Sequence, residues 1–170
     1  GPTAMDLSGN ALNGTYTGAV VVSGSAAADH APVPGTNQRS LNFTPGPPEP
    51  GAFVSTPDAA SLRFTGPFTA AAWIKPTAYA VSPANNWSVI VGKWDWVATP
   101  GVINGWGMQL ANYGKIFMFN GTTLAYTTPW SNGTAPLNVW THAAVVFDGA
   151  FNRIYINGVE DMSAASAIAP

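Results

Sequence analysis

"NVWTHAAVVFDGAFNRIYINGVEDM", residues 138–162, is the most regular stretch of the chain. Successive side chains of a strand point to opposite faces, so "WTHAAVVF" divides into two largely apolar sets. One set is Trp140, His142, Ala144 and Val146, and the other is Thr141, Ala143, Val145 and Phe147. Apolar residues on both faces are typical of a central strand that is covered on both sides. Asp148-Gly149 and Asn157-Gly158 are turn dipeptides, so the stretch predicts two successive hairpins.

His142 and Asp148 in this stretch also raise the question of a hydrolytic site. A catalytic triad needs a nucleophile, a base and an orienting acid within reach of one another. Six residues of extended strand separate these two side chains by about 20 Å, at about 3.3 Å per residue. The sequence therefore predicts a strand histidine that is bonded locally, in a hairpin that holds no active site.

Short strand-like segments fill the rest of the chain. The 18 glycines and 15 prolines leave little room for long helices, although "PDAASLRF" is predicted to hold one helical turn with Asp58 as its cap. "TPGPPEPG", residues 44–51, is predicted to be an exposed loop, and five Asn-Gly dipeptides are predicted to be turns. The strands expected at residues 17–24, 39–43, 51–56, 68–76, 87–94, 105–112, 115–120 and 122–127 predict one all-β domain over 1–170, an antiparallel β-sandwich of the jelly-roll type.

Composition excludes two classes of partner. The chain has 170 residues, of which 8% are charged, and its net charge is −2. Its six lysines and arginines are scattered, whereas nucleic-acid binding and membrane-surface binding need clustered cations. No run approaches the ~18 apolar residues of a membrane span, so membrane insertion is not expected. Cysteine is absent, which excludes disulfides.

Three blocks of sequence resemble the laminin-G-like, concanavalin A-like jelly rolls. "NVWTHAAVVFDGAFNRIYINGVE" is similar to the family's Trp-x-His strand, Asp-Gly turn and Tyr-x-Asn-Gly hairpin. "DLSGNALNGTYTG", residues 6–18, resembles its N-terminal loop, and "SLRFTGPFTAAAWIKPT", residues 61–77, its middle strand pair. The resemblance implies the jelly-roll fold, but it leaves function open because this fold carries lectins, adhesins, hydrolases and spacers.

The chain departs from that family at both ends. Family members usually have a further strand before the Asp-x-Ser-Gly-Asn loop and further strands after the last hairpin, whereas this chain starts almost at "DLSGN" and stops at "SAASAIAP". It could be a piece of a longer protein, be completed by a partner, or have rearranged terminal elements. Sheets without these strands would have open edges, through which self-association or pairing with neighbouring domains is expected.

Paired carboxylates, which glycoside hydrolases place on either side of the scissile bond, are not evident. The Glu-x-Asp-x-x-Glu strand of jelly-roll glucanases is absent, and the two glutamates are Glu49 in a proline-rich loop and Glu160 in the last hairpin. Asp95 stands alone in "WDW". An enzyme is therefore not expected.

A structural calcium ion is one interpretation of "DLSGNALNG". Calcium takes six to eight oxygen ligands from carboxylates, amides and carbonyls. Asp6, Asn10 and Asn13 supply such oxygens in a glycine-bearing loop, and the resemblance implies a calcium ion there in some family members. The alternative is an Asx-type turn without metal.

Tryptophan is the remaining candidate for function. Sugar rings stack their apolar C–H face on aromatic planes, and neighbouring amides bond the sugar hydroxyls. Trp94, Trp96 and Trp130 are the predicted carbohydrate-binding residues, whereas Trp73 and Trp140 are expected in the core. The sequence thus predicts a non-catalytic extracellular module that binds a glycan or cell-surface polysaccharide, with a structural subunit of an extracellular assembly as the alternative.

Overall fold

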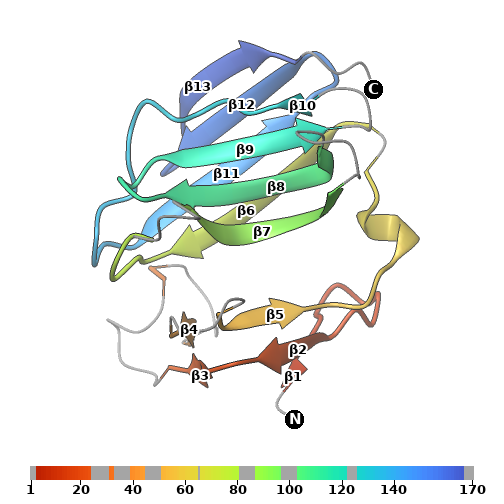
Figure 1. Cartoon of the computed structure of the whole chain (residues 1–170), viewed down its shortest axis with the longest axis vertical. Coiled ribbons are helices and arrows are strands. Elements are labelled where there is room, and N and C mark those ends of the chain that lie inside the picture. The colour runs from red at the N-terminus through yellow and green to blue at the C-terminus, as the bar shows by residue number, and fades with distance from the viewer. Residues whose placement is uncertain are drawn as a thin grey trace. The chain divides into compact units, whose positions relative to one another are not determined.

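The computed structural model describes residues 3–23, 31–32, 39–44, 51–64, 66–80, 87–96, 103–121 and 126–166. It is all-β with antiparallel sheets, which confirms the predicted fold class. The chain divides into two compact units, residues 1–62 and 63–170 (Figure 1). The single domain over 1–170 stays a prediction. Within the described ranges, no helix has the length and apolarity needed to cross a membrane.

The first unit holds short strands. A three-stranded sheet has the order β1-β2-β5, and a separate pair joins β3 to β4. A 3-10 turn, η2 (Ala60–Leu62), follows Asp58 and confirms the predicted helical turn. The predicted loop at 44–51 lies mostly outside the described residues. The strand bounds are β1 Thr3–Ala4, β2 Gly14–Thr17, β3 Val20–Val22, β4 Leu41–Phe43 and β5 Phe53–Ser55.

The second unit is a sandwich of two four-stranded sheets (Figure 1). The β7–β10 sheet has the order β10-β9-β8-β7, and the β6–β13 sheet has the order β13-β12-β11-β6. All pairings within the two sheets are antiparallel. The bounds are β6 Phe68–Ile74, β7 Trp87–Trp96, β8 Ile103–Ala111, β9 Ile116–Gly121, β10 Tyr126–Thr127, β11 Thr141–Phe147, β12 Phe151–Ile156 and β13 Val159–Ala165.

The core lies between these two sheets. The β7–β10 sheet contributes alternate residues of β8 and β9, among them Met108, Ile116 and Met118. The β6–β13 sheet contributes Val145 and Ile154, and all five side chains have 0% exposure. Burial of each such side chain contributes about 1.5–3 kcal/mol. The period-two alternation of the sequence thus becomes one apolar layer, and it leaves the intervening residues on the outer faces.

The stretch that opened the analysis forms β11, β12 and β13. β11 lies between β6 and β12, which makes it a central strand. The two residue sets lie on opposite faces of β11, as the period-two pattern predicts: Ala143, Val145 and Phe147 face the core, and His142 faces outward. Asn157 and Gly158 have φ values of 52° and 81°, and they form the predicted hairpin turn between β12 and β13.

Two other predicted Asn-Gly turns are wrong. Asn104-Gly105 lies within β8 and Asn120-Gly121 within β9, because both dipeptides continue the strand ladders. At Gly105 a Cβ atom would lie 2.2 Å from the carbonyl oxygen of Lys93. Glycine at position 105 therefore allows the two strands to approach closely, and it does not form a turn.

Candidate functional site

The outer surface of the β7–β10 sheet carries a continuous layer of aromatic rings. Phe117 and Phe119 point outward from β9 because their neighbours Ile116 and Met118 point into the core. Both phenylalanines are nevertheless covered, with exposed fractions of 6% and 2%. Part of this cover comes from tryptophan side chains that pack on them. We call the surface formed by Trp87, Trp94, Phe117, Phe119 and Trp130 the aromatic face.

The rings of the aromatic face meet in two kinds of geometry. Trp130 stacks on Phe117 with 4.5 Å between ring centroids and 18° between planes, and Tyr113 stacks against Trp130 at 6.0 Å. Trp94 meets Phe119 edge-on at 5.0 Å, and Trp87 meets Phe117 edge-on at 6.0 Å. These are favoured aromatic arrangements, so the tryptophans are held in fixed orientations.

A β-bulge brings Trp87 and Trp94 to the same surface. Val89 pairs with Gln109, but Val91 pairs with Met108, so Ile90 is an extra residue in β7. Without it, positions 87 and 94 would point to opposite faces, since they are an odd number of residues apart. The extra residue restores the alternation, and both indoles reach rings of β9.

Glycines and one amide complete the aromatic face. A Cβ atom at Gly107 would lie 2.4 Å from Cζ of Phe119, and one at Gly92 would lie 2.7 Å from Cζ3 of Trp94. The Phe119 ring therefore lies directly on the backbone of the neighbouring strand β8, and the Trp94 ring lies over Gly92 of its own strand β7. Gln109, which pairs with Phe117, adds a mostly buried amide. Chemically, the site is an aromatic, apolar surface with one almost fully buried amide.

The structure brings together two of the three predicted tryptophans. Trp94 and Trp130 both belong to the aromatic face and are partly buried. Trp96 ends β7 opposite Ile103, but its side chain lies outside the described residues. Trp87 was missed by the sequence prediction, although its side chain has an exposed fraction of 43%. Strict alternation from Trp94 puts it on the wrong face, and the sequence carries no clear signal of the bulge.

The predicted metal loop is closed by its own hydrogen bonds. Asp6 Oδ1 accepts from the backbone N–H of Ser8 at 2.7 Å, and Asp6 Oδ2 accepts from that of Leu12 at 2.9 Å. Asn13 Oδ1 accepts from the N–H of Asp6 at 2.8 Å. The Asn10 amide nitrogen donates to Ser8 Oγ. The Ser8 side chain, followed by the N–H of Leu12, lowers the pKa of Asp6.

As arranged, this loop has the geometry of the Asx-type turn that the sequence left as the alternative. It offers one carboxylate, and three of its side-chain oxygens already accept from N–H groups. The part of the chain that is described contains no group of three or more His, Cys, Asp or Glu residues that could hold a metal ion. Calcium at Asp6, Asn10 and Asn13 stays a prediction.

An ion network runs along β12 on the outer surface of the β6–β13 sheet, from Asp148 in the β11–β12 turn to Glu160 at the start of β13. Arg153 on β12 pairs with Asp148, and its Nε lies 3.5 Å from Glu160 Oε2. Tyr155 donates its hydroxyl hydrogen to Glu160 at 3.1 Å. The Arg153 guanidinium and the N–H groups of Phe151 and Ala150 lower the pKa of Asp148 to about 2. Asp148 is therefore ionised at neutral pH.

His142 is bonded within its own sheet, as the sequence predicts. Its backbone N–H donates to Asn157 Oδ1 at 2.9 Å, and its ring lies 5.3 Å from that of Trp73. Asp148 is bound by Arg153 beyond the far end of β11. These two residues therefore do not form part of a triad. Trp73, which was expected in the core, lies on the outer face, because Ala72 and Ile74 are the core-facing residues beside it.

Comparison with known families gives one match. The profile of a laminin-G-type family described as the concanavalin A-like lectin/glucanases superfamily matches residues 49–170. This range includes the whole sandwich and both predicted resemblance blocks from residue 61 onward, but not the block at 6–18. A search of curated proteins found no match.

Proposed function

The chain belongs to the concanavalin A-like lectin/glucanases superfamily, and from that premise we propose that it is a non-catalytic carbohydrate-binding module. Members of the superfamily commonly bind carbohydrates or mediate adhesion, and some are glycosidases. In our proposal, the glycan stacks on the aromatic face of the β7–β10 sheet. The proposed place of action is outside the cell or at its surface, where polysaccharide ligands occur.

The aromatic face is the observation that carries this proposal. Trp87 is 43% exposed on the outer face of the β7–β10 sheet, whose inner face forms the core. Trp94 and Trp130 are anchored on Phe119 and Phe117, so little side-chain entropy is lost when a ligand binds them. The Gln109 amide next to Phe117 is only 5% exposed, so the proposed recognition rests mainly on ring stacking. Rigid aromatic surface with a few polar groups is the usual make-up of a small-ligand site.

The carboxylates that the structure brings together support a non-catalytic role. Asp148 and Glu160 share Arg153, and the pKa of Asp148 is held at about 2. A general acid needs a pKa near the working pH, so Asp148 cannot deliver a proton at neutral pH. Glu160 accepts the Tyr155 hydroxyl as well. This set behaves as a structural ion network. Glu49 lies outside the described residues, as does the side chain of Asp95.

A glycan panel with paired variants tests the proposal. Trp94→Ala and Trp87→Ala should each weaken binding by about tenfold or more, which corresponds to about 1.4 kcal/mol. Phe151→Ala is the matched control, because it removes an exposed aromatic side chain from the β6–β13 sheet. Circular dichroism should show that all variants are folded. Binding that survives both tryptophan variants would refute the role of the aromatic face, and no binding on a broad panel would refute the function.

Edge exposure favours a second candidate, a self-associating structural subunit. In the described part of the chain, β7 pairs with β8 alone, and its Val89 and Val91 have exposed fractions of 52% and 36%. A charge-poor surface also resists association weakly. The bulge and Lys93 on the same strand are, in contrast, features that protect sheet edges.

Light scattering across protein concentrations tests this second candidate. An ordered oligomer that Val91→Lys dissociates would support assembly through β7. A monomer at all concentrations would refute self-association and leave the binding module as the one function proposed.

A further inference from the structure

The accessible part of the aromatic face lies along the edge strand β7. Trp87 and Val89 lie on the outer side of this strand, with exposed fractions of 43% and 52%. The outward residues of the inner strands are covered instead, since Gln109 of β8 and Phe119 of β9 have exposed fractions of 5% and 2%. A ligand of the aromatic face therefore makes its contacts mainly along β7.

Four outward positions of β7 form one continuous row. Trp87 and Val89 precede the bulge, and Gly92 and Trp94 follow it on the same side of the sheet. Gly92 is exposed, and Trp94 is partly buried. We call these four residues the β7 stripe.

The β7 stripe is longer than one sugar ring. Its two indoles belong to Trp87 and Trp94, which pair with Ala111 and Gly105 of β8. Six residues of extended strand separate these two partners, which corresponds to about 20 Å at about 3.3 Å per residue. One pyranose ring cannot reach both indoles, whereas a chain of several sugars can. The stripe therefore fits a linear glycan that lies parallel to β7.

The middle of the β7 stripe is aliphatic. Between the indoles it presents the side chain of Val89 and the backbone of Gly92. A sugar hydroxyl that is pressed against Val89 loses its bond to water and gains no partner. A methyl group in the same place is stabilised, because apolar surface is removed from water. An acetamido substituent carries such a methyl group, so the middle of the stripe favours an N-acetylated sugar.

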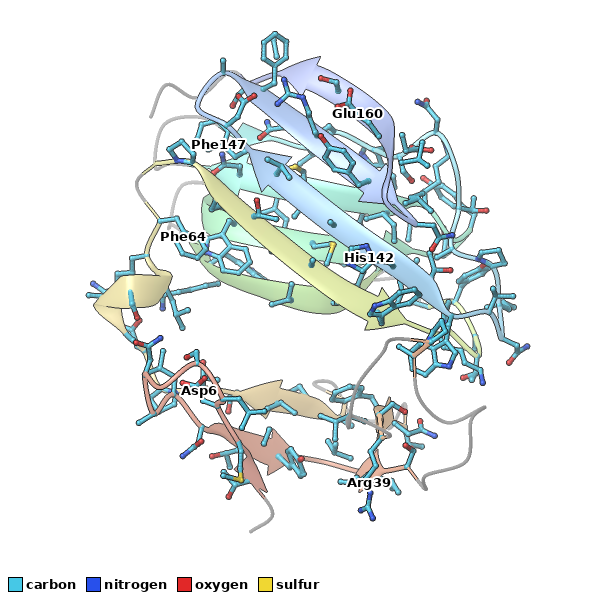
Figure 2. All side chains as sticks on the ribbon, turned by 180° about the vertical axis from the view of Figure 1, so that it is seen from behind. Asp6, Arg39, Phe64, His142, Phe147 and Glu160 are labelled. Atoms are coloured by element: carbon cyan, nitrogen blue, oxygen red, sulfur yellow. The ribbon has the colours of Figure 1, made fainter. Side chains whose placement is uncertain are left out.

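Charged side chains lie away from the β7 stripe. Lys93 points to the other side of β7, because its partner Trp106 belongs to the core. The outer surface of the β6–β13 sheet differs, since it carries Glu160 and the Arg153 network together with His142 (Figure 2). The stripe itself consists of uncharged residues, which suits an uncharged ligand.

We propose that the β7 stripe binds a linear, uncharged chain of N-acetylated sugars, such as a chito-oligosaccharide. One sugar stacks on Trp87 and another on Trp94, and the acetamido methyl group of a sugar between them contacts Val89. This inference rests on the function proposed above and adds the chemistry, the length and the direction of the ligand.

Calorimetric titration of the full chain with chitobiose, chitotetraose and chitohexaose tests the length of the site. Affinity should rise by about tenfold or more from chitobiose to chitohexaose, because only the longer chain stacks on both indoles. Trp94→Ala should remove this rise, since Trp87 alone then stacks on a sugar. Equal affinity of the wild type for chitobiose and chitohexaose would overturn the extended mode of binding.

Cellohexaose is the matched ligand, because it has the same linkage and length but hydroxyl groups where chitohexaose has acetamido groups. The wild type should bind chitohexaose at least about fourfold more tightly, as expected for one buried methyl group. Val89→Thr, which replaces a methyl by a hydroxyl group, should remove most of this preference. Val159→Thr on β13 is the matched control, because Val159 is also exposed, and it should leave both affinities unchanged.

The outcomes separate this inference from the function proposed above. Cellohexaose binding as tight as chitohexaose binding, or an unchanged preference in folded Val89→Thr, would exclude recognition of the acetamido group and leave a carbohydrate-binding module in place. No binding of either ligand would also overturn this inference, whereas the broad glycan panel decides the general function. Loss of the preference in Val159→Thr as well would show that Val89 does not make the contact.

Discussion

Asp161 on β13 accepts hydrogen bonds from the backbone N–H of Asn132, at 2.5 Å, and from that of Gly133, at 2.9 Å. The Asn132 amide donates in return to the Asp161 carbonyl at 2.6 Å. The adjacent Ser131 accepts the N–H of Ile116 at 2.9 Å. The loop that begins directly after Trp130 is thus fixed to both sheets, and so is one end of the aromatic face.

Asp161→Ala should therefore loosen this loop and the Trp130 side chain. Two backbone N–H groups lose a charged acceptor, so the free energy of unfolding should fall by about 1–3 kcal/mol. Urea denaturation followed by tryptophan fluorescence measures the change. Asp161→Asn, which keeps one acceptor oxygen, should lose less. Equal stability of Asp161→Ala and the wild type would contradict the role of this clamp.

Gly107→Ala should disrupt the aromatic face, because the added Cβ would meet the Phe119 ring at 2.4 Å and 2.5 Å. Overpacking of this kind costs about 1–3 kcal/mol. Gly66→Ala is the matched control, since a Cβ there has no atom within 4 Å, and its effect should stay within about 0.5 kcal/mol. Thermal unfolding measures both, and similar midpoints for the two variants would show that Phe119 moves away freely.

Asn157 combines two roles that two substitutions separate. Its φ of 52° is in the left-handed region, and its Oδ1 accepts the N–H of His142. Asn157→Gly keeps the turn conformation and loses only the acceptor. Asn157→Ala also strains the backbone, by about 1–2 kcal/mol. Chemical denaturation should rank the wild type first, then the glycine variant, then the alanine variant, and a reversed order of the variants would contradict the turn assignment.

The lowered pKa of Asp148 predicts that the folded chain loses stability in acid. Its pKa is lowered from 3.8 to about 2 in the folded chain, so its stabilising contribution is present above pH 3.8 and is lost as pH falls toward 2. Arg153→Met removes the main cause. We expect the thermal midpoint of the wild type to fall more steeply across this window than that of the variant. Equal slopes of the two midpoint-versus-pH curves would contradict this role of Asp148. Added salt should bring the curves of the wild type and Arg153→Met closer together.

Asp6→Ala should destabilise the first loop even in the presence of a chelator, because the N–H groups of Ser8 and Leu12 lose their acceptors. Calcium binding by Asp6, Asn10 and Asn13 adds a second expectation. Millimolar calcium should then raise the thermal midpoint of the wild type but not that of Asp6→Ala. A wild-type midpoint that calcium leaves unchanged would assign the loop to the Asx-type turn alone.

Much of the sandwich could be predicted because its signals are local. The alternation in "WTHAAVVF" predicted that its two residue sets lie on opposite faces of β11, and Asn157-Gly158 predicted the turn of the final hairpin. The other Asn-Gly pairs carry the same local signal, yet Asn104 and Asn120 lie inside strands. At these two dipeptides, hydrogen bonding to neighbouring strands favoured a strand over a turn. No short stretch of sequence encodes such pairing.

The candidate site likewise depends partly on local sequence signals and partly on the tertiary structure. The sequence by itself determined the hydrophobic alternation of the sandwich strands and the prediction of Trp94, Trp96 and Trp130 as binding residues, because residue type and period two are local properties. Only the tertiary structure decided that the bulge at Ile90 brings Trp87 to the same face as Trp94, and that Trp73 lies outside the core. The physical reason is that one extra residue reverses every later side chain of a strand, and that the partner strand β8 determines where that residue is accommodated.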